Sequence, residues 1–138
     1  MSDVSNLSGA ELDAAVARAE GRLVEADEPG WPAGDLKKLQ QKYGQPVVRW
    51  YGGDGEIGGW EPLSNQGSPS TDWSIGGPII DREQISLLKP GYGGEPEWTA
   101  GVNVIHSYDG WEAEFEATGP TPLIAAMRAF VASKGAAS

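Results

Sequence analysis

The sequence contains no cysteine and a single histidine, and these two shortages exclude several kinds of chemistry. Disulfide bonds, thiolate nucleophiles and cysteine-ligated zinc sites all require a thiol. A pair of imidazole metal ligands requires a second histidine, and a catalytic triad would depend on His106 alone. His106 shares an alternating segment with Val102 and Val104, which is typical of a half-buried structural histidine. We therefore expect no catalytic residue, no metal site and no cofactor, and we expect that the protein is not an enzyme.

Positive charge is scarce as well. The 138 residues include 20 Asp and Glu but 10 Lys and Arg, which gives a net charge of -10 at pH 7. Phosphate backbones repel such a chain, so direct binding to nucleic acid is disfavoured. Lys37, Lys38 and Lys42 form the one cluster of cations, and their spacing is typical of a solvated helix face.

Long apolar runs are also missing. No segment approaches the roughly 20 apolar residues that a membrane-spanning helix requires. The first six residues have neither the basic start nor the apolar core of a signal peptide. We expect a soluble, cytoplasmic protein that does not bind membranes. Residues 1–138 are expected to form a single domain, because chains of this length usually do.

A capped helix is predicted at each end of the chain. Near the N-terminus, Ser8 and Glu11 match a capping box, and Gly21 marks the end of the helix. Near the C-terminus, Thr121 can cap a helix that Gly135 ends. Apolar residues recur at helical spacing in this last helix, so one side of it must be buried. They are Leu123, Met127, Phe130 and Val131.

The middle region, residues 27–67, is rich in glycine. Within it we predict a short polar helix over 35–43 and a strand over 47–51. Glycine-rich turns surround these elements. We expect the region to be loosely ordered except where three aromatic residues anchor it. These are Trp50, Tyr51 and Trp60.

The clearest strand pattern lies in the second half of the chain. Apolar residues alternate with glutamates over 111–117, and Asp109-Gly110 before them is typical of a hairpin turn. A partner strand is predicted over 102–106. The side that carries Trp111 and Phe115 should lie against the last helix.

The remaining segments complete the predicted fold. Residues 85–88 are predicted to form a further strand. Residues 70–83 are predicted to form two helical turns that break at Gly76-Gly77-Pro78. The pattern predicts an α+β fold, in which a small antiparallel sheet of three to four strands is packed against N-terminal and C-terminal helices.

Several motifs follow one another in a recognisable order. The first helix ends in Glu20-Gly21-Arg22, and Ser68-Pro69-Ser70-Thr71-Asp72-Trp73 follows the middle region. Gly76-Gly77-Pro78-Ile79-Ile80 and Arg82-Glu83 come next, and the series closes with Gly119–Lys134 after a strand that carries tryptophan. In this order the motifs resemble the NinX-like proteins of lambdoid phages and prophages. The resemblance implies a phage or prophage origin and carries no activity with it.

The residues Ser70, Thr71 and Asp72 are a first candidate site. They place three side-chain oxygens at a helix start, where free backbone N–H groups can hold an anion or be capped. One interpretation is a site for a small anionic or polar ligand, with Trp73 as its wall. The other is an N-cap with a buried Trp73 that pins the turn to the core.

Arg82 and Glu83, next to Asp81, are a second candidate. Two carboxylates can perform acid–base chemistry when burial separates their pKa values. On a polar helix end, a solvated ion pair is the simpler interpretation.

Aromatic residues beside glycine-rich loops are a third candidate. Flat rings on adaptable backbone suit a recognition surface, but rings in loops also tie long loops to a core. The sequence leaves both interpretations open. The residues are Trp50, Tyr51, Trp60, Tyr92 and Trp98.

The glutamates Glu112, Glu114 and Glu116 allow two interpretations. Alternate strand positions lie about 7 Å apart on one face, comparable to the charge spacing of an extended nucleic-acid backbone. The row could therefore imitate DNA in front of a basic groove. Polar residues at alternate positions are equally expected on the solvent-exposed face of an antiparallel sheet.

Together these features predict a phage-derived accessory protein that acts without catalysis, by binding a host or phage protein. The first alternative is a domain that binds a small ligand or carbohydrate with its loop aromatics. The second alternative is an acidic inhibitor that mimics DNA.

Overall fold

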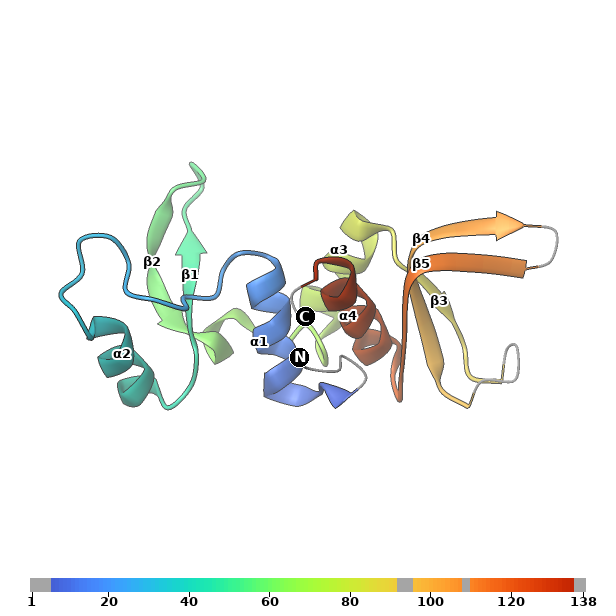
Figure 1. Ribbon diagram of the computed structural model, residues 1–138, viewed down its shortest axis with the longest axis horizontal. Helices are drawn as coiled ribbons and strands as arrows, with labels where there is room; N and C mark the ends of the chain where they lie inside the picture. The colour runs from blue at the N-terminus through green and yellow to red at the C-terminus, as the bar shows by residue number, and fades with distance from the viewer. Residues whose placement is uncertain (1–5, 92–95, 108–109, 136–138) are drawn as a thin grey trace.

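The chain forms two antiparallel sheets and four α-helices within the described residues, arranged along one long axis (Figure 1). The computed structural model describes residues 6–91, 96–107 and 110–135, with the backbone alone for 106 and 107. The helices are α1 (Gly9–Ala19), α2 (Asp35–Tyr43), α3 (Trp73–Glu83) and α4 (Pro122–Ser133). The strands are β1 (Val47–Tyr51), β2 (Ile57–Pro62), β3 (Ser86–Leu88), β4 (Trp98–Ser107) and β5 (Gly110–Gly119), and a short 3-10 helix, η2 (Leu63–Gln66), follows β2.

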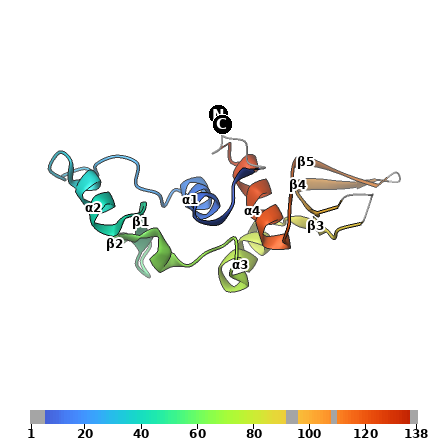
Figure 2. The same ribbon diagram turned by 90° about the horizontal axis from the view of Figure 1, so that it is seen from below.

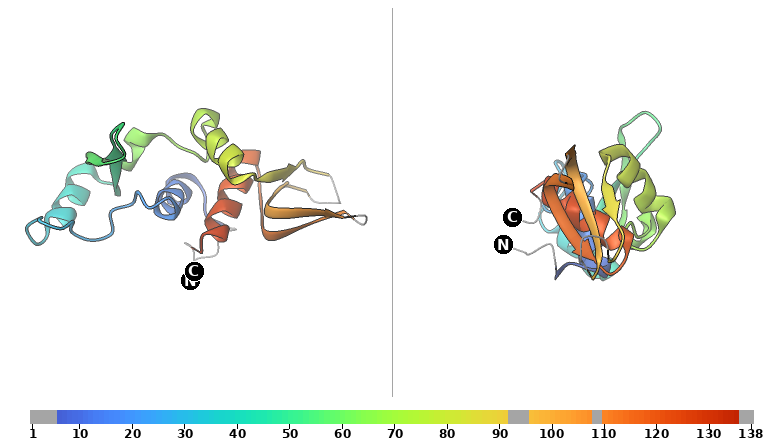
Figure 3. Two further views of the ribbon diagram at one scale, coloured as in Figure 1. Left: turned by 90° about the horizontal axis from the view of Figure 1, so that it is seen from above. Right: turned by 90° about the vertical axis from the view of Figure 1, so that its right-hand side faces the viewer.

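Helix α4 lies at the centre of the main core. It packs against the three-stranded sheet on one side and against α1 and α3 on others, as Figures 2 and 3 show from different directions. Eight of its residues are buried, so its apolar surface extends around most of the helix. The four residues of its predicted stripe are all among them. The core that α4 shares with the sheet also includes Leu12 and Val16 of α1.

The three-stranded sheet has the order β3-β4-β5, and both pairings are antiparallel. Ala100 pairs with Ala117 and Val102 with Phe115, which places these side chains against the core. Trp111 lies further along the β4–β5 hairpin, where a Cβ on Gly101 would come within 2.5 Å of its ring.

The predicted α+β class is confirmed, and so are several element ends. Thr121 caps α4 by accepting the backbone N–H of Ile124 at 3.1 Å, and Gly135 has a positive φ of 69°. Glutamates and apolar residues alternate in exposure along β5 as predicted. Ser107 at the end of β4 pairs with Gly110 at the start of β5. The predicted turn residue Asp109 lies outside the described residues.

Two local predictions at helices are wrong. Ser8 is the N-cap of α1, but its side chain makes no capping hydrogen bond. Helix α3 continues through Gly76-Gly77-Pro78 instead of breaking there. Pro78 deprives the carbonyl of Ser74 of its helical donor, but Ser74 is exposed and water can bond to it.

The reason for a glycine at position 76 is close packing. A Cβ on Gly76 would overlap the carbonyl oxygen of Pro69 and would lie 2.7 Å from the side chain of Leu123. The residue is buried at the contact between α3 and the start of α4. The sequence shows a glycine but not the atoms that pack against it in the folded protein. A glycine that is required for close packing therefore could not be told from a glycine that ends a helix.

The middle region has a small core of its own. Val24, Leu36 and Val47 are buried there, and the partly buried rings of Trp31 and Trp60 pack against them. The two rings meet edge to face at a centroid distance of 4.9 Å. The predicted helix over 35–43 and strand over 47–51 are confirmed.

The prediction that Trp50 and Tyr51 anchor this region is wrong, because both are exposed. The anchoring aromatic residue of β1–β2 is Trp60. Trp50 and Tyr51 lie beyond the part of β1 that the small core covers, at the turn end of the hairpin.

A second set of contacts connects the middle region to α1. Leu23 forms a β-bridge to Val48, and Val48 packs with Ala17 of α1 and Leu63. Gln66 adds polar contacts: its amide nitrogen donates to the backbone oxygen of Arg49 at 2.7 Å, and its amide oxygen accepts from the Arg22 guanidinium.

We expect Gly76→Ala to lower the free energy of unfolding by on the order of 1–3 kcal/mol, because the added methyl group overpacks the α3–α4 contact. Gly77→Ala is the matched control, since its Cβ would meet Trp73 at an ordinary 3.8 Å. This change should be neutral or stabilise the helix by up to about 1 kcal/mol. Urea unfolding of both variants measures the difference, and equal effects would contradict the packing argument.

Candidate functional site

The first candidate site is organised by a buried aspartate of α1. Asp13 is 7% exposed, and its carboxylate accepts the backbone N–H of Ser70 at 3.0 Å and the hydroxyl of Ser68 at 2.6 Å. Ser70 is 1% exposed, and the hydrogen bond from its backbone N–H to Asp13 holds the loop to α1. Nothing in the sequence pattern distinguished Asp13 from the other acids of a helix.

Asp72 is the N-cap of α3. Its carboxylate accepts both the hydroxyl and the backbone N–H of Ser74, and these bonds lower the pKa of Asp72. The cap interpretation is therefore realised in the structure. Trp73 is 53% exposed, so its predicted burial is wrong.

A small cavity of about 230 Å³ adjoins this capped helix start. It lies between the beginnings of α3 and α4, and an exposed ring, three hydroxyl-bearing residues and apolar groups form its wall. The lining residues are Ser70, Thr71, Trp73, Thr121, Pro122, Leu123 and Ile124.

The second candidate, Arg82 with Glu83, belongs to a chain of ion pairs. The Arg82 guanidinium donates to Glu83 at 2.9 Å and to Glu20 of α1 at 3.0 Å. Lys134 lies 3.2 Å from the other carboxylate oxygen of Glu83. The bonds from Arg82 and Lys134 hold the pKa of Glu83 below its usual value. These contacts connect α1, α3 and the end of α4.

The aromatic candidates separate into two groups. Trp60 and Trp98 are partly buried and pack against hydrophobic cores, so they contribute to the fold. Trp50 and Tyr51 are 43% and 47% exposed. Tyr92 lies outside the described residues.

The β1–β2 hairpin presents large apolar side chains to solvent on both of its faces. Trp50 and Tyr51 come from β1, and Ile57, which pairs with Tyr51, is 46% exposed on β2. Ile57 was missed by the sequence reasoning, although its position between two pairs of glycine indicated an exposed hairpin. We call Trp50, Tyr51 and Ile57 the hairpin patch.

The base of the hairpin is held by Glu28. Its carboxylate accepts from Arg49 at 2.5 Å and from the Trp60 indole at 3.3 Å. The hydrogen bond from Arg49 is the main reason that the pKa of Glu28 is lowered. Arg49 also donates to the backbone oxygens of Gly21 and Leu23, so the hairpin is bonded to the segment after α1.

The stretch of sequence that carries the hairpin patch is acidic. No lysine, arginine or histidine occurs between Arg49 and Arg82. Four of the five exposed large hydrophobic residues in the described part of the chain lie in this cation-free stretch. Its acidic residues are Asp54, Glu56, Glu61, Asp72 and Asp81.

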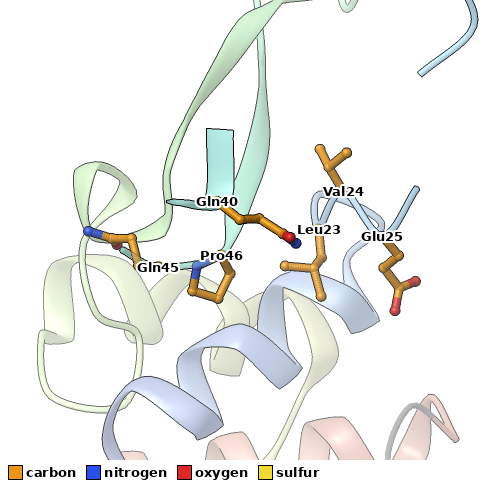
Figure 4. A pocket seen from close by; sticks show the side chains of 6 residues that line it. All are labelled: Leu23, Val24, Glu25, Gln40, Gln45 and Pro46. Carbon is orange, nitrogen blue, oxygen red and sulfur yellow. The ribbon is translucent and has the colours of Figure 1, made fainter. Parts of the chain in front are cut away.

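A larger pocket, of about 410 Å³, lies beside β1 (Figure 4). Its residues come from the segment after α1, from α2 and from the stretch that joins α2 to β1. Glu25 at its rim is ion-paired with Arg18 at 3.0 Å. The other lining residues are Leu23, Val24, Gln40, Gln45 and Pro46, all neutral.

The remaining candidates lie at the opposite end of the molecule. Glu112, Glu114 and Glu116 are all exposed on β5, and Glu114 accepts a hydrogen bond from Asn103 at 3.1 Å. His106 pairs with Trp111 through the backbone, and its side chain lies outside the described part. Within residues 6–91, 96–107 and 110–135, no three acidic or histidine side chains are grouped so that they could hold a metal ion. No described helix is long and apolar enough to cross a bilayer.

Comparison with models of known families matches residues 3–134 to the family described as Bacteriophage P22, NinX. The matched range includes every described helix and strand, so the resemblance seen in the motifs is confirmed. Comparison with proteins of curated function gives no match.

Glu28 should contribute to stability in a pH-dependent way. Because its pKa is lowered in the folded state, this contribution is complete above the usual glutamate value of about 4.3 and is lost as the pH falls through the lower folded pKa. Glu28→Gln should be less stable at neutral pH by about 1–2 kcal/mol and should lose less stability on acidification. Urea unfolding between pH 7 and pH 3 measures this.

The control for this experiment is Glu56→Gln, because Glu56 is exposed and forms no ion pair within the described residues. Its acid dependence should match that of the unmodified protein. An equally shallow acid dependence in both variants would contradict the role of the Glu28–Arg49 pair.

Proposed function

The chain belongs to the bacteriophage P22 NinX family, and on that premise we propose that it is a phage accessory protein that binds a partner protein without catalysis. The observation that carries the proposal is the hairpin patch. Three large apolar side chains, each more than 40% exposed, lie near the turn end of one hairpin, with Trp50 on one face and the paired Tyr51 and Ile57 on the other. Large apolar side chains left exposed on one small element mark interaction surfaces in proteins.

The position of the patch supports a role in binding. The hairpin extends away from the main core, at one end of the long axis (Figure 1). Its base is fixed by Glu28 and by the small core around Val47, so the exposed rings are carried on an ordered support. A rigid aromatic residue loses little conformational entropy when a partner covers it, which is why tryptophan and tyrosine dominate binding energies at interfaces.

The hydrogen bonds of two candidate residues, Asp72 of the first site and Glu83 of the second, support a non-catalytic role. Asp72 uses its carboxylate to cap α3, and Glu83 is paired with two cations. Both have lowered pKa values, so both are ionised at neutral pH and neither can donate a proton as a general acid.

The row of glutamates on β5 favours a second candidate function. Glu112, Glu114 and Glu116 are all exposed, as a mimic of a nucleic-acid backbone requires. In this function the partner is a basic protein, and binding is governed by charge. A carbohydrate or other neutral ligand of the loop aromatics is the remaining alternative.

A capture experiment from host and phage-infected lysates tests the main proposal. We expect the unmodified protein to retain a partner that is lost, by at least tenfold, in the triple variant Trp50→Ser, Tyr51→Ser, Ile57→Ser. The control variant Trp73→Ser, Ile105→Ser removes two exposed apolar side chains of other elements and should retain the partner. Circular dichroism confirms that both variants are folded. Equal retention by the triple variant would disprove a role of the hairpin patch.

The DNA-mimic function makes a different prediction. Glu112→Gln, Glu114→Gln, Glu116→Gln should abolish capture of a basic partner, and binding by the unmodified protein should weaken steeply between 50 and 500 mM salt, a range over which screening lengths shrink severalfold. Capture that is unchanged by salt and by these substitutions eliminates this function.

A further inference from the structure

The indole of Trp50 has an unusual support. It lies across the backbone of Gly58 and Gly59, opposite it on β2, and yet it remains 43% exposed. A Cβ on Gly58 would overlap the six-membered ring, and a Cβ on Gly59 would lie 2.8 Å from the indole nitrogen. One face of the ring is therefore covered by peptide backbone, while a large part of it remains open to solvent.

The two glycines are explained by the ring and not by the backbone. Neither Gly58 nor Gly59 has a positive φ, so any residue could adopt their conformation. What excludes a larger residue at both positions is the volume that Trp50 occupies. Trp50 belongs to none of the hydrophobic core clusters of the described residues, and the ring that it holds over the two glycines is also available for stacking.

Carboxylates that form no ion pair within the described residues lie on the same hairpin as this ring. Glu61 follows Gly59 by two positions on β2, so it lies on the same face of the sheet, about 7 Å along the strand. Its carboxylate is oriented by a hydrogen bond from Gln66 at 3.0 Å. Asp54 and Glu56 lie in the exposed hairpin turn, and neither forms an ion pair in the described structure.

Two arginines that are bonded to this part of the chain, Arg22 and Arg49, already have acidic partners. Arg22 pairs with Glu20 at 2.7 Å, and Arg49 pairs with Glu28 on the other face of the hairpin. Glu61, Asp54 and Glu56 form no ion pair within the described residues, so a cation of another molecule can pair with them.

We propose that the Trp50 platform binds an arginine side chain of the partner protein, whose guanidinium stacks on the indole while the nearby carboxylates attract its charge. This proposal rests on the proposed function, because the arginine belongs to the partner. A guanidinium is planar, remains charged at all relevant pH values and stacks on indole faces more readily than an ammonium group. A nucleotide also stacks on indole, but its phosphates would be repelled by the same carboxylates.

The test uses short synthetic peptides and the full-length protein. The probe is acetyl-Gly-Arg-Gly-Arg-Gly-amide, and the matched controls carry citrulline, which is neutral and nearly the same shape, or lysine. Binding is followed by the indole N–H resonances in a ¹⁵N-labelled sample, and the Trp50 resonance is the one absent from Trp50→Phe. We expect the arginine peptide to shift the Trp50 resonance, with at least threefold weaker binding for lysine and no saturable shift for citrulline.

Variants of the platform extend the test. Gly59→Ala should displace the ring and weaken the arginine peptide severalfold, and Glu61→Gln should weaken it while leaving the indole resonance of the free protein in place. The inference is overturned if the arginine peptide leaves Trp50 unshifted or if citrulline shifts it equally. If the triple variant loses its partner but the arginine peptide has no effect, the proposed function stands and this inference fails. If the arginine peptide shifts Trp50 but no partner is lost, the inference about the platform is supported and the proposed function fails.

Discussion

The burial of α4 between α1 and the three-stranded sheet is the constraint on which the main core depends. Because most of this helix is apolar, every neighbouring element can pack against it, and α1, α3 and the sheet all do. Arg128, which is 8% exposed, is the one charged residue among the buried residues of α4. Its guanidinium donates to the backbone oxygens of Leu7 at 2.8 Å and Thr118 at 2.7 Å, which compensates for its desolvation and connects both flanks of the helix.

The hairpin patch is exposed because of how the middle region is attached. This region reaches the rest of the molecule through α1, by the small cluster of Ala17, Val48 and Leu63 and by the polar contacts of Gln66. An attachment at one side leaves the turn end of β1–β2 far from α4 and uncovered (Figure 1). The same elongated shape places the glutamates of β5 at the opposite end, so the two candidate surfaces are separate.

The accuracy of the sequence-based predictions follows from the range of the interactions involved. The bounds of α2 and β1 were predicted correctly, because Gly44 and the apolar pair Val47-Val48 act on their immediate neighbours. The break at Gly76 was wrong, because the closest atoms to that glycine belong to Pro69 and Leu123. Of the candidate site, Trp50 and Tyr51 were named because they are aromatic residues beside glycine-rich loops. The support of Trp50 by two glycines could not be predicted without the register of β1 and β2.

By itself, the sequence determined the cap and stop of α4, the stop of α2, the alternation along β5 and the acidic character of the stretch that follows Arg49. These features depend on residue identity and on contacts within a few positions along the chain, so they can be predicted without knowledge of the fold. The tertiary structure alone decided which rings are buried and which are exposed. Trp60 packs against Trp31 and Val47, whereas Trp50, ten positions earlier, lies open on glycine, because exposure depends on what distant segments cover.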